Sequence, residues 1–402
     1  SYYGYYLHKA SKAGRKEGTD ISEHSSISCG ERRILQRSPS LRQSSGKFTA
    51  TEFCLVEPFK FEAREGVIDS VPRGFLLLKP VVAGICGSEM LYFKGEKERW
   101  KLEKRLPMCL LHEGVARIVE SGERTRLSPG THVVVNPMIP CKKCVACKSS
   151  EENLCEASKY MAATADGLAR TLFLYPEEAT LIVPQEVPLE LAALTEPISI
   201  ALNALEESQA QKDCLAAIIG DGPVGYLLAL VASYVAEVSR ENLYFVGVVD
   251  QKLALANDFA TTVNSLKEKG AMARLRERFD VVFEAAGGKA QMVTIDQAID
   301  LLRPGGRCVL LGLSSGRVSV EMAKIVNKGL TIKGSTRSKS DHYTKVLELL
   351  RNGEFAERVR RTISEKKFTI RTAEDLEEAF RYADTEEGEA RMKPGRVLVY
   401  FP

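Results

Sequence analysis

Several features are missing from this 402-residue sequence, and each absence narrows the possible functions. No apolar run approaches the roughly 20 residues of a membrane-spanning helix, and candidates such as 214–219 and 309–313 have the length of strands. The formal charge of +3 is too small for a nucleic-acid-binding surface. No internal repeat is apparent. These absences argue against membrane and nucleic-acid partners and leave a small molecule as the expected one.

What the sequence does contain is a cysteine cluster with metal-ligand spacing. Cys141, Cys144, Cys147 and Cys155 follow a CxxCxxCx7C pattern, and four thiolates can close a tetrahedral shell around one Zn²⁺. A closed shell has no position for water or substrate, so residues 141–155 are predicted to form a structural zinc lobe. The alternative is a set of buried or disulfide-bonded cysteines. The other six cysteines are scattered singly, which suggests no disulfide framework and favours a reducing compartment; we therefore expect a cytoplasmic protein.

The residue pattern changes along the chain and predicts separate regions. Residues 1–47 are rich in Ser, Arg, Lys and Gly without helix or strand period, which indicates a flexible extension or leader. Residues 48–198 contain short strands and tight turns, for example at 74–82, 114–120 and 131–135, typical of a β-rich catalytic domain.

Strands and helices alternate from 199 to 336, which predicts a parallel sheet with crossovers. The expected strands are 215–220, 243–249, 280–284, 307–311 and 330–333, and the expected helices include 223–235 and 291–302. Residues 337–402 add a helix at 342–351 and a last strand at 395–401, which is expected to pair back with the first domain.

A glycine motif opens the second region. Gly220, Gly222 and Gly225 form GxGxxG directly after an apolar strand, and Pro223 and Val224 begin a helix. The first glycine permits a tight turn, the second lets a pyrophosphate approach the backbone, and the third lets helix and strand pack closely. The free N–H groups of the helix N-terminus suit phosphate. The motif predicts dinucleotide binding.

The choice between NAD and NADP depends on the end of the following strand. Asp250 there would hydrogen-bond the ribose 2′-hydroxyl and repel a 2′-phosphate, although it lies later than the usual spacing. If the strand ends at Gly247, no carboxylate occupies that position, and Lys252 is near enough to meet a 2′-phosphate. Both cofactors remain open.

Four further residues are candidates for a catalytic metal site. Cys86 follows an apolar strand, His112 and Glu113 adjoin, and Glu196 precedes a proline at the domain junction. Thiolate, imidazole and carboxylate are all suitable for a zinc ion that keeps one position open. The alternative is a small core cysteine and a hydrogen-bonded structural histidine.

Together these motifs resemble the zinc-containing medium-chain alcohol and polyol dehydrogenases over residues 48–402. The resemblance rests on GICGSE, the HE pair in LLHEG, the cysteine lobe, EP at 196–197, GDGPVG, and FEAAGG followed by LRPGGRCVLLG. It implies an α/β protein with a GroES-like β-rich catalytic domain built from both chain ends, a Rossmann doubly wound parallel sheet between them, and homodimers or homotetramers.

The resemblance also implies residue roles and two zinc ions per chain, besides NAD or NADP. Cys86 and His112 would hold the catalytic zinc, with Glu113 and Glu196 as alternating or additional ligands, and Ser88 would relay the substrate proton.

The sequence departs from the pattern at two positions. Leu91 stands where sorbitol-type enzymes usually have a histidine, and Leu111 stands where a glycine usually precedes the HE pair.

Two segments, RLPMCLLHEGV and KGLTIKGSTRSKSDHY, are most similar to ribulose-5-phosphate reductases (ribitol-5-phosphate dehydrogenases). That resemblance would place Ser335, Arg337 and Ser338 near a phosphate of the substrate or cofactor, where an arginine fork pairs well. Alternatively these residues cap the helix near His342. The four-cysteine lobe is often missing from that group.

We therefore predict an enzyme, a zinc-dependent NAD(P) oxidoreductase acting on a secondary alcohol or ketone of a polyol or polyol phosphate, such as ribitol 5-phosphate or ribulose 5-phosphate. The alternatives are a free-polyol (sorbitol-like) or threonine-type dehydrogenase, and a non-catalytic zinc-binding scaffold or interaction protein.

Overall fold

The computed structural model describes residues 47–313, 316–384 and 395–402. These described residues form one compact unit. The flexible extension predicted for residues 1–47 lies, except for Lys47, outside the described residues. None of the described helices is long and apolar enough to cross a membrane.

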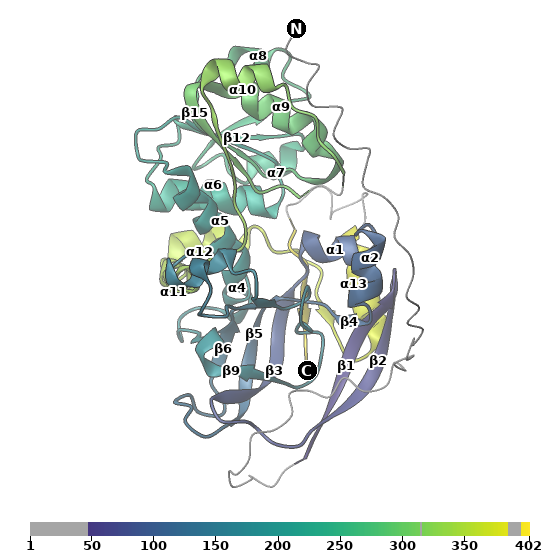
Figure 1. The fold of residues 1–402 in the computed structure, drawn as a ribbon. Helices are drawn as coiled ribbons and strands as arrows, with labels where there is room; N and C mark the ends of the chain where they lie inside the picture. Colours follow the sequence, from purple (N-terminus) through teal and green to yellow (C-terminus); the bar gives the residue numbers. More distant parts are fainter. Residues whose placement is uncertain (1–46, 314–315, 385–394) are drawn as a thin grey trace, which may run out of the picture. The chain divides into compact units, whose positions relative to one another are not determined.

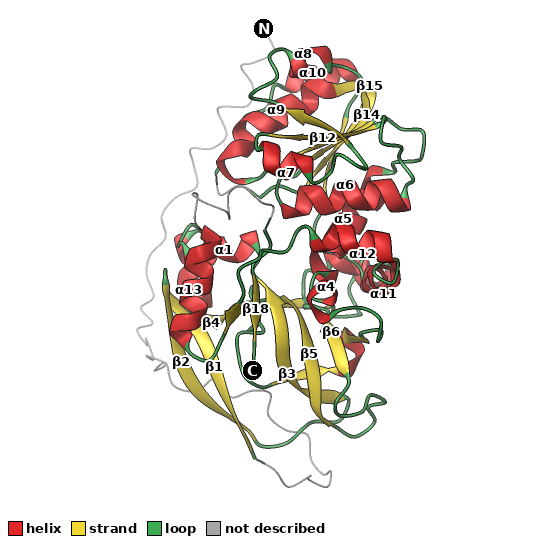
Figure 2. Ribbon diagram, turned by 180° about the vertical axis from the view of Figure 1, so that it is seen from behind, coloured by secondary structure: helices red, strands yellow, loops and turns green. Residues whose placement is uncertain are grey.

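Segments from both ends of the chain build the mainly antiparallel sheets (Figures 1 and 2). The larger sheet has the order β10-β6-β5-β3-β18-β17, with β9 also paired to β3. Its strands are β3 (Phe75–Gly84), β5 (Glu113–Ser121), β6 (His132–Val135), β9 (Phe173–Pro176), β10 (Thr180–Ile182), β17 (Phe368–Thr369) and β18 (Leu398–Tyr400). A three-stranded sheet joins β1 (Phe48–Glu57), β2 (Lys60–Ile68) and β4 (Met108–Cys109), and β7 (Met138–Ile139) pairs with β8 (Lys159–Tyr160).

Aromatic side chains from both ends of the chain close the core of this β-rich part. Phe61 of β2 stacks on Phe93 of α1 (Gly87–Phe93), and Phe380 of α13 (Ala373–Asp384) lies against both rings, with centroids 5.2 Å from each. All three residues are buried. Burial of such large rings is a strong apolar contribution, so the C-terminal segment completes the core of the first domain.

Strand β18 completes the larger sheet in the same way. It pairs antiparallel with β3, with Val399 opposite Ala83, which confirms that the last strand returns to the first domain. In Figure 2 the C-terminus lies among the strands of this sheet.

The middle of the chain forms a six-stranded parallel sheet with the order β13-β12-β11-β14-β15-β16, the doubly wound arrangement. Its strands are β11 (Ala216–Ile219), β12 (Leu243–Gly247), β13 (Thr261–Asn264), β14 (Phe279–Glu284), β15 (Leu302–Leu310) and β16 (Thr331–Gly334). Successive residues face opposite sides. Ala216 and Ile218 pack into one apolar cluster with α6 (Pro223–Val235), and Ala217 and Ile219 pack into another with α9 (Gln291–Leu301). The predicted α/β class with a Rossmann sheet is confirmed.

The remaining helices connect these parts. They are α2 (Arg99–Arg105), α3 (Val145–Lys148), α4 (Leu189–Ala192), α5 (Thr195–Ser208), α7 (Asp250–Ala254), α8 (Ala271–Arg274), α10 (Met322–Lys328), α11 (Ser340–Leu349) and α12 (Gly353–Arg360), with 3-10 turns η1 (Glu152–Leu154), η2 (Glu177–Ala179) and η3 (Gly288–Ala290).

Several boundaries differ from the sequence prediction: β15 begins at Leu302 rather than at 307, β18 is shorter than 395–401, and β13 was not predicted. Two further differences have a visible cause. Strand β12 ends at Gly247, which is the alternative that the sequence left open beside 249, because the backbone N–H groups of Val248 and Val249 donate to the carboxylate of Asp221 instead of continuing the sheet. Helix α11 begins at Ser340 rather than at 342, and its first N–H donates to Oε1 of Glu152 from the cysteine lobe. Both differences arise from side chains distant in sequence.

The domain boundaries stay our proposal. The six strands of the parallel sheet lie within 199–336, and the described strands of the other sheets lie in 48–198 and 337–402. Helix α5 runs across the proposed 198/199 boundary, so one continuous helix links the β-rich part to the parallel sheet.

Candidate active site and metal centres

The four cysteines of the lobe lie close together around α3 and η1. The sulfur atoms of Cys141 and Cys147 are 4.0 Å apart, and those of Cys144 and Cys147 are 3.4 Å apart. The backbone N–H of Cys141 donates to the sulfur of Cys155 at 3.3 Å. A Zn–S distance of about 2.3 Å in a tetrahedron places sulfurs about 3.8 Å apart. The donor set therefore fits a structural zinc ion.

The backbone of the lobe favours a thiolate at its first ligand. The N–H groups of Lys143 and Cys144 lower the pKa of Cys141 to about 6. Since a metal binds the thiolate rather than the thiol, this position is prepared for a cation.

A second candidate metal centre lies where the end of β3 meets the beginning of β5, since Gly84 pairs with Glu113. Cys86 precedes α1, His112 precedes β5, and Glu113 is its first residue. One ligand atom from each lies within 4.8 Å of the others. His112 and Glu113 are buried, and Cys86 is half-buried. Thiolate, imidazole and carboxylate on adjacent strand ends fit a three-ligand zinc site.

Glu89 orients the histidine of this centre. Its carboxylate accepts from the backbone N–H of Cys86 at 3.0 Å, and its other oxygen lies 2.6 Å from Nδ1 of His112. The other ring nitrogen of His112, Nε2, is then free to bind a metal and lies 4.0 Å from Oε1 of Glu113. Burial alone would lower the pKa of His112, but Glu89 and Cys86 outweigh it and raise that pKa well above its ordinary value. A carboxylate behind a metal-binding histidine is a common orienting device.

The carboxylate of Glu113 has no hydrogen bond, although it is fully buried. Nε of Arg396, itself buried, lies 3.3 Å from Oε2 of Glu113, close enough for an ion pair but not aligned for a hydrogen bond. Gly84 leaves room for the pair, since a Cβ there would lie 2.7 Å from that same oxygen. An unsatisfied buried carboxylate is costly, and a bound cation would satisfy it.

Glu196 lies near this centre but is held by another partner. It is buried in the first turn of α5, and Oε1 accepts from the hydroxyl of Tyr160 at 2.9 Å. Burial raises the pKa of Glu196 to about 7. The group of ligand atoms within 4.8 Å of one another contains Cys86, His112 and Glu113 and not Glu196.

Ser88 and Leu111 also border the centre. The Ser88 hydroxyl donates to the sulfur of Cys86 at 3.4 Å. Leu111 is buried and has a φ of 71°, in the left-handed region that glycine adopts at lowest cost. The carbonyl of Leu111 accepts from the N–H of Leu168 at 2.6 Å, which holds the strained residue beside His112. Leu91, the other departure, lies in the last turn of α1 and is half-buried.

The glycine loop lies between β11 and α6 as predicted. Gly220 has a φ of +127°, and a Cβ there would meet the backbone of Ala285 at 2.7 Å. A Cβ on Gly225 would lie 1.9 Å from the carbonyl oxygen of Gly220. Nothing lies within 4 Å of the Cβ position of Gly222, so the backbone there is open to a ligand. Pro223 and Val224 form the first turn of α6, whose N–H groups suit a pyrophosphate.

The residues considered for cofactor choice lie beyond the strand end. Asp250 is the first residue of α7, accepts from Nδ2 of Asn264 at 2.5 Å, and forms an ion pair with Lys267. Lys252 lies two residues further in the same helix.

The three residues expected near a phosphate are engaged inside the protein. Ser335 accepts from Nδ2 of Asn203 at 2.9 Å, and the hydroxyls of Ser338 and Ser199 are 2.7 Å apart, so both contact α5. The guanidinium of Arg337 donates to the carbonyl of Cys155 at 3.2 Å, and thus ties the cysteine lobe to the segment before α11.

Sequence reasoning missed three residues of the candidate site. Glu89 had a signal, since it lies at the third position of a helix whose preceding residue is Cys86, where a side chain can reach back. Tyr160, whose ring centroid lies 5.7 Å from that of His112, and Arg396 had none, because tertiary contacts alone bring them to the centre.

The comparisons with known proteins agree with this architecture. Residues 72–185 match the alcohol dehydrogenase GroES-like domain family, and residues 223–352 match the zinc-binding dehydrogenase family. The chain therefore belongs to the zinc-binding alcohol and polyol dehydrogenases, whose members use zinc and a nicotinamide cofactor.

Individual relatives are named for sugar and polyol chemistry. The chain is 28% identical over 332 residues to ribulose-5-phosphate reductase 1 of Staphylococcus aureus, covering 81% of this chain and 93% of that one. It is 28% identical over 318 residues to a probable D-xylulose reductase A of Emericella nidulans, covering 76% and 85%. Among solved structures, S. aureus TarJ in complex with NADPH is similar with a TM-score of 0.72 and 25% identity, covering 88% of this chain and 100% of that one.

Proposed function

We propose that this protein transfers a hydride between a nicotinamide cofactor and a secondary alcohol or ketone of a polyol or polyol phosphate. The observation that carries the proposal is the convergence of Cys86, His112 and Glu113 within 4.8 Å, in a chain whose parallel sheet also carries an open GxGxxG loop. A zinc-binding scaffold would need the cysteine lobe alone, and it gives no reason for this second set of possible metal ligands.

The residues of the candidate centre are proposed to have different roles: some bind the metal, one orients His112 and one transfers the substrate proton. Cys86, His112 and Glu113 would hold a zinc ion, which when bound supplies a Lewis acid that polarises the substrate oxygen. Glu89 keeps His112 in the orientation that presents Nε2. The Ser88 hydroxyl, beside the sulfur of Cys86, is the candidate to pass the substrate proton outward. Glu196, held by Tyr160, stays a candidate alternating ligand.

The nucleotide is proposed to lie on the parallel sheet. Its pyrophosphate would bind at the glycine loop (Gly220, Gly222 and Gly225) and the first turn of α6. This loop follows β11, which lies beside β14 at the point where the strand order reverses, the place at which doubly wound sheets bind ligands. The protein would mainly position the two reactants and exclude water.

Two substrate classes remain, and a relative's name supports one of them, whereas the structure supports the other. The name of the S. aureus relative supports ribulose 5-phosphate and ribitol 5-phosphate. The internal hydrogen bonds of Ser335 and Ser338 favour a free polyol, because hydroxyls already bound to α5 are less available to a phosphate.

A zinc-replete activity screen tests the proposal. Polyols and their 5-phosphates are supplied with NAD and with NADP, and nicotinamide absorbance is followed in both directions. Strong preference for ribitol 5-phosphate or ribulose 5-phosphate supports the phosphorylated substrate, activity only on free polyols rejects it, and no activity on any of them contradicts the proposed function.

We also propose a homodimer or homotetramer in the cytoplasm. Strand β16 is one of the two edge strands of the parallel sheet, and its residues Thr331, Lys333 and Gly334 are exposed. Such an edge offers backbone groups to the same strand of a second copy. The described cysteines are all free thiols, as expected in a reducing compartment. Light scattering after size exclusion measures the assembly.

A further inference from the structure

In this protein a glycine, Gly247, stands at the position whose side chain usually decides between NAD and NADP. In Rossmann folds an acidic residue at the end of the second strand hydrogen-bonds the adenosine ribose 2′-hydroxyl. Here the second strand, β12, ends at Gly247, which has no side chain. Asp250 lies three residues further, in α7, where Lys267 and Asn264 occupy its carboxylate.

Another carboxylate fills that place. Asp221, from the GDGPVG loop itself, points at the end of β12: a Cβ atom on Gly247 would lie 2.5 Å from Oδ2 of Asp221 and 2.8 Å from its Cγ. The carboxylate of Asp221 thus occupies the volume that a side chain at position 247 would take.

Hydrogen bonds hold the Asp221 side chain in this position. Oδ2 accepts from the backbone N–H of Val248 at 2.7 Å and of Val249 at 2.8 Å. Both bonds use the same oxygen, and no donor among the described residues bonds to Oδ1. A charged acceptor with two backbone donors is firmly placed, and one oxygen remains for a ligand.

We propose that Asp221 takes over the role of the strand-end acid, by accepting from the ribose 2′-hydroxyl of NAD(H) and repelling the 2′-phosphate of NADP(H). The proposal rests on the proposed nicotinamide function and adds its cofactor preference. The neighbouring Gly222, whose Cβ position is open, leaves the nucleotide room beside Asp221. This chain would therefore prefer NADH, although its relative TarJ was solved with NADPH.

Direct nucleotide binding to the zinc-loaded protein, without substrate, tests this proposal. Nicotinamide fluorescence gives Kd for NADH and NADPH. Displacement of NADH by 5′-AMP or by 2′,5′-ADP compares a ribose 2′-hydroxyl with a 2′-phosphate in the absence of the nicotinamide. We expect NADH to bind about tenfold or more tightly than NADPH, since like charges in contact are strongly unfavourable. In Asp221→Asn, which keeps an oxygen for the two backbone donors, we expect the NADPH-to-NADH ratio of Kd values to fall about tenfold.

Three further variants make the result decisive. Asp221→Ser removes the charge with a smaller side chain and should shift the ratio in the same direction. Asp213→Asn, the same change at an exposed residue before β11, should leave the ratio unchanged. Asp250→Asn examines the rival carboxylate.

Some outcomes would overturn the proposal while nicotinamide binding itself persists. They are NADPH binding as tightly as NADH, an unchanged ratio in both Asp221 variants, or a shift in Asp250→Asn alone. Failure to bind either nucleotide would instead contradict the proposed function, and this inference with it.

Discussion

The two candidate zinc sites of this protein are assembled in opposite ways. The cysteine lobe takes its four sulfurs from 15 residues, 141–155, around one short helix and one 3-10 turn. The candidate catalytic centre combines Cys86 with the His112–Glu113 pair, and it depends on Glu89 and on Arg396 from the far end of the chain.

The difference teaches what each site requires from the fold. Three of the four lobe cysteines are half-buried, and their spacing alone brings the ligands within reach of one ion. At the other centre, buried carboxylates and an imidazole are acceptable only because the sheet holds compensating charges against them. A local site should therefore tolerate changes elsewhere, whereas the distributed centre should be sensitive to its supporting residues.

The largest effect is expected from a ligand of the distributed centre. In Cys86→Ala we expect the protein to bind one zinc ion per chain fewer than the unchanged protein. We also expect kcat to fall by about a thousandfold or more, because several kcal/mol of transition-state stabilisation are lost. Mass spectrometry of the metal and steady-state kinetics measure these changes. NADH binding should persist, and normal turnover in this variant would contradict the assignment.

The matching change in the lobe should affect stability rather than chemistry. Cys144→Ser leaves three sulfur ligands, and we expect loss of the lobe zinc and a fall in Tm of roughly 5–10 °C, since structural zinc binding contributes to folding free energy. Calorimetry measures the Tm. If turnover per folded protein fell as far as in Cys86→Ala, the division into structural and catalytic sites would be wrong.

The supporting residue Glu89 should have an intermediate effect. Glu89→Ala leaves Nδ1 of His112 without its partner, and we expect the affinity of the catalytic zinc to fall about 10–100-fold. Competition with a chelator measures it. Glu89→Gln should recover part of the affinity, whereas the lobe zinc should be unaffected in both variants.

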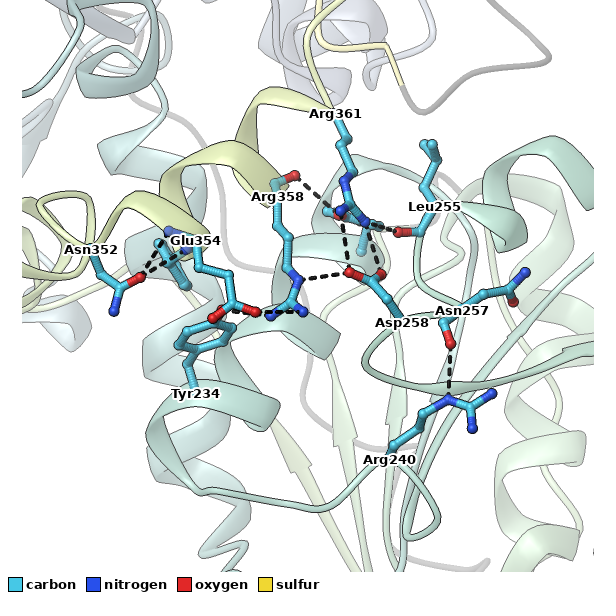
Figure 3. A network of polar contacts seen from close by, with 11 residues as sticks. Tyr234, Arg240, Leu255, Asn257, Asp258, Asn352, Glu354, Arg358 and Arg361 are labelled. Atoms are coloured by element: carbon cyan, nitrogen blue, oxygen red, sulfur yellow. Dashed lines mark hydrogen bonds and ion pairs between the residues drawn. The ribbon is translucent and has the colours of Figure 1, made fainter.

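The smallest effect on stability is expected from exposed ion pairs between residues that are distant in sequence. Figure 3 shows Asp258 beside two arginines that lie about 100 residues later in the sequence. Arg358 belongs to α12, and Arg361 directly follows that helix. Nε of Arg358 and the guanidinium of Arg361 donate to its two carboxylate oxygens at 2.9 and 2.8 Å. Partial burial acts to raise the pKa of Asp258, but the two arginines outweigh it and lower that pKa.

The sign of the pH dependence follows from that lowered pKa. The stabilisation by Asp258 is present above its ordinary pKa of about 3.9 and is lost as the pH falls through the lower folded-state pKa. Because 41% of the side chain is exposed, Asp258→Asn should cost at most about 1 kcal/mol at pH 7. Urea unfolding between pH 7 and about pH 3 should show this difference shrink as the acid limit is approached. A difference that grew with acidification would contradict the argument.

Local patterns in the sequence predicted much of the fold. The helix expected at 223–235 is α6, Pro223–Val235, because its apolar period, the preceding glycine and the proline at its first position agree. The cysteine spacing and the GxGxxG loop were recognisable for the same reason: all the groups that each requires lie within one short segment.

Predictions failed where a distant side chain decided the backbone. Val248 and Val249 are β-branched and favour a strand by propensity, but Asp221 takes their N–H groups and ends β12 at Gly247. In the same way, Glu152 accepts a hydrogen bond from the backbone N–H of Ser340, and helix α11 begins there, two residues earlier than expected.

The sequence by itself determined which candidate groups this chain carries. They are two sets of side chains suited to a metal and a loop suited to a dinucleotide, each recognisable from residue types and short spacings. Only the tertiary structure decided how these groups are used. It brought Arg396 to Glu113, placed Glu89 behind His112, assigned Glu196 to Tyr160 and turned Asp221 toward Gly247. The physical reason is that burial makes charged groups depend on partners, and those partners come from whichever strand or helix packs against them.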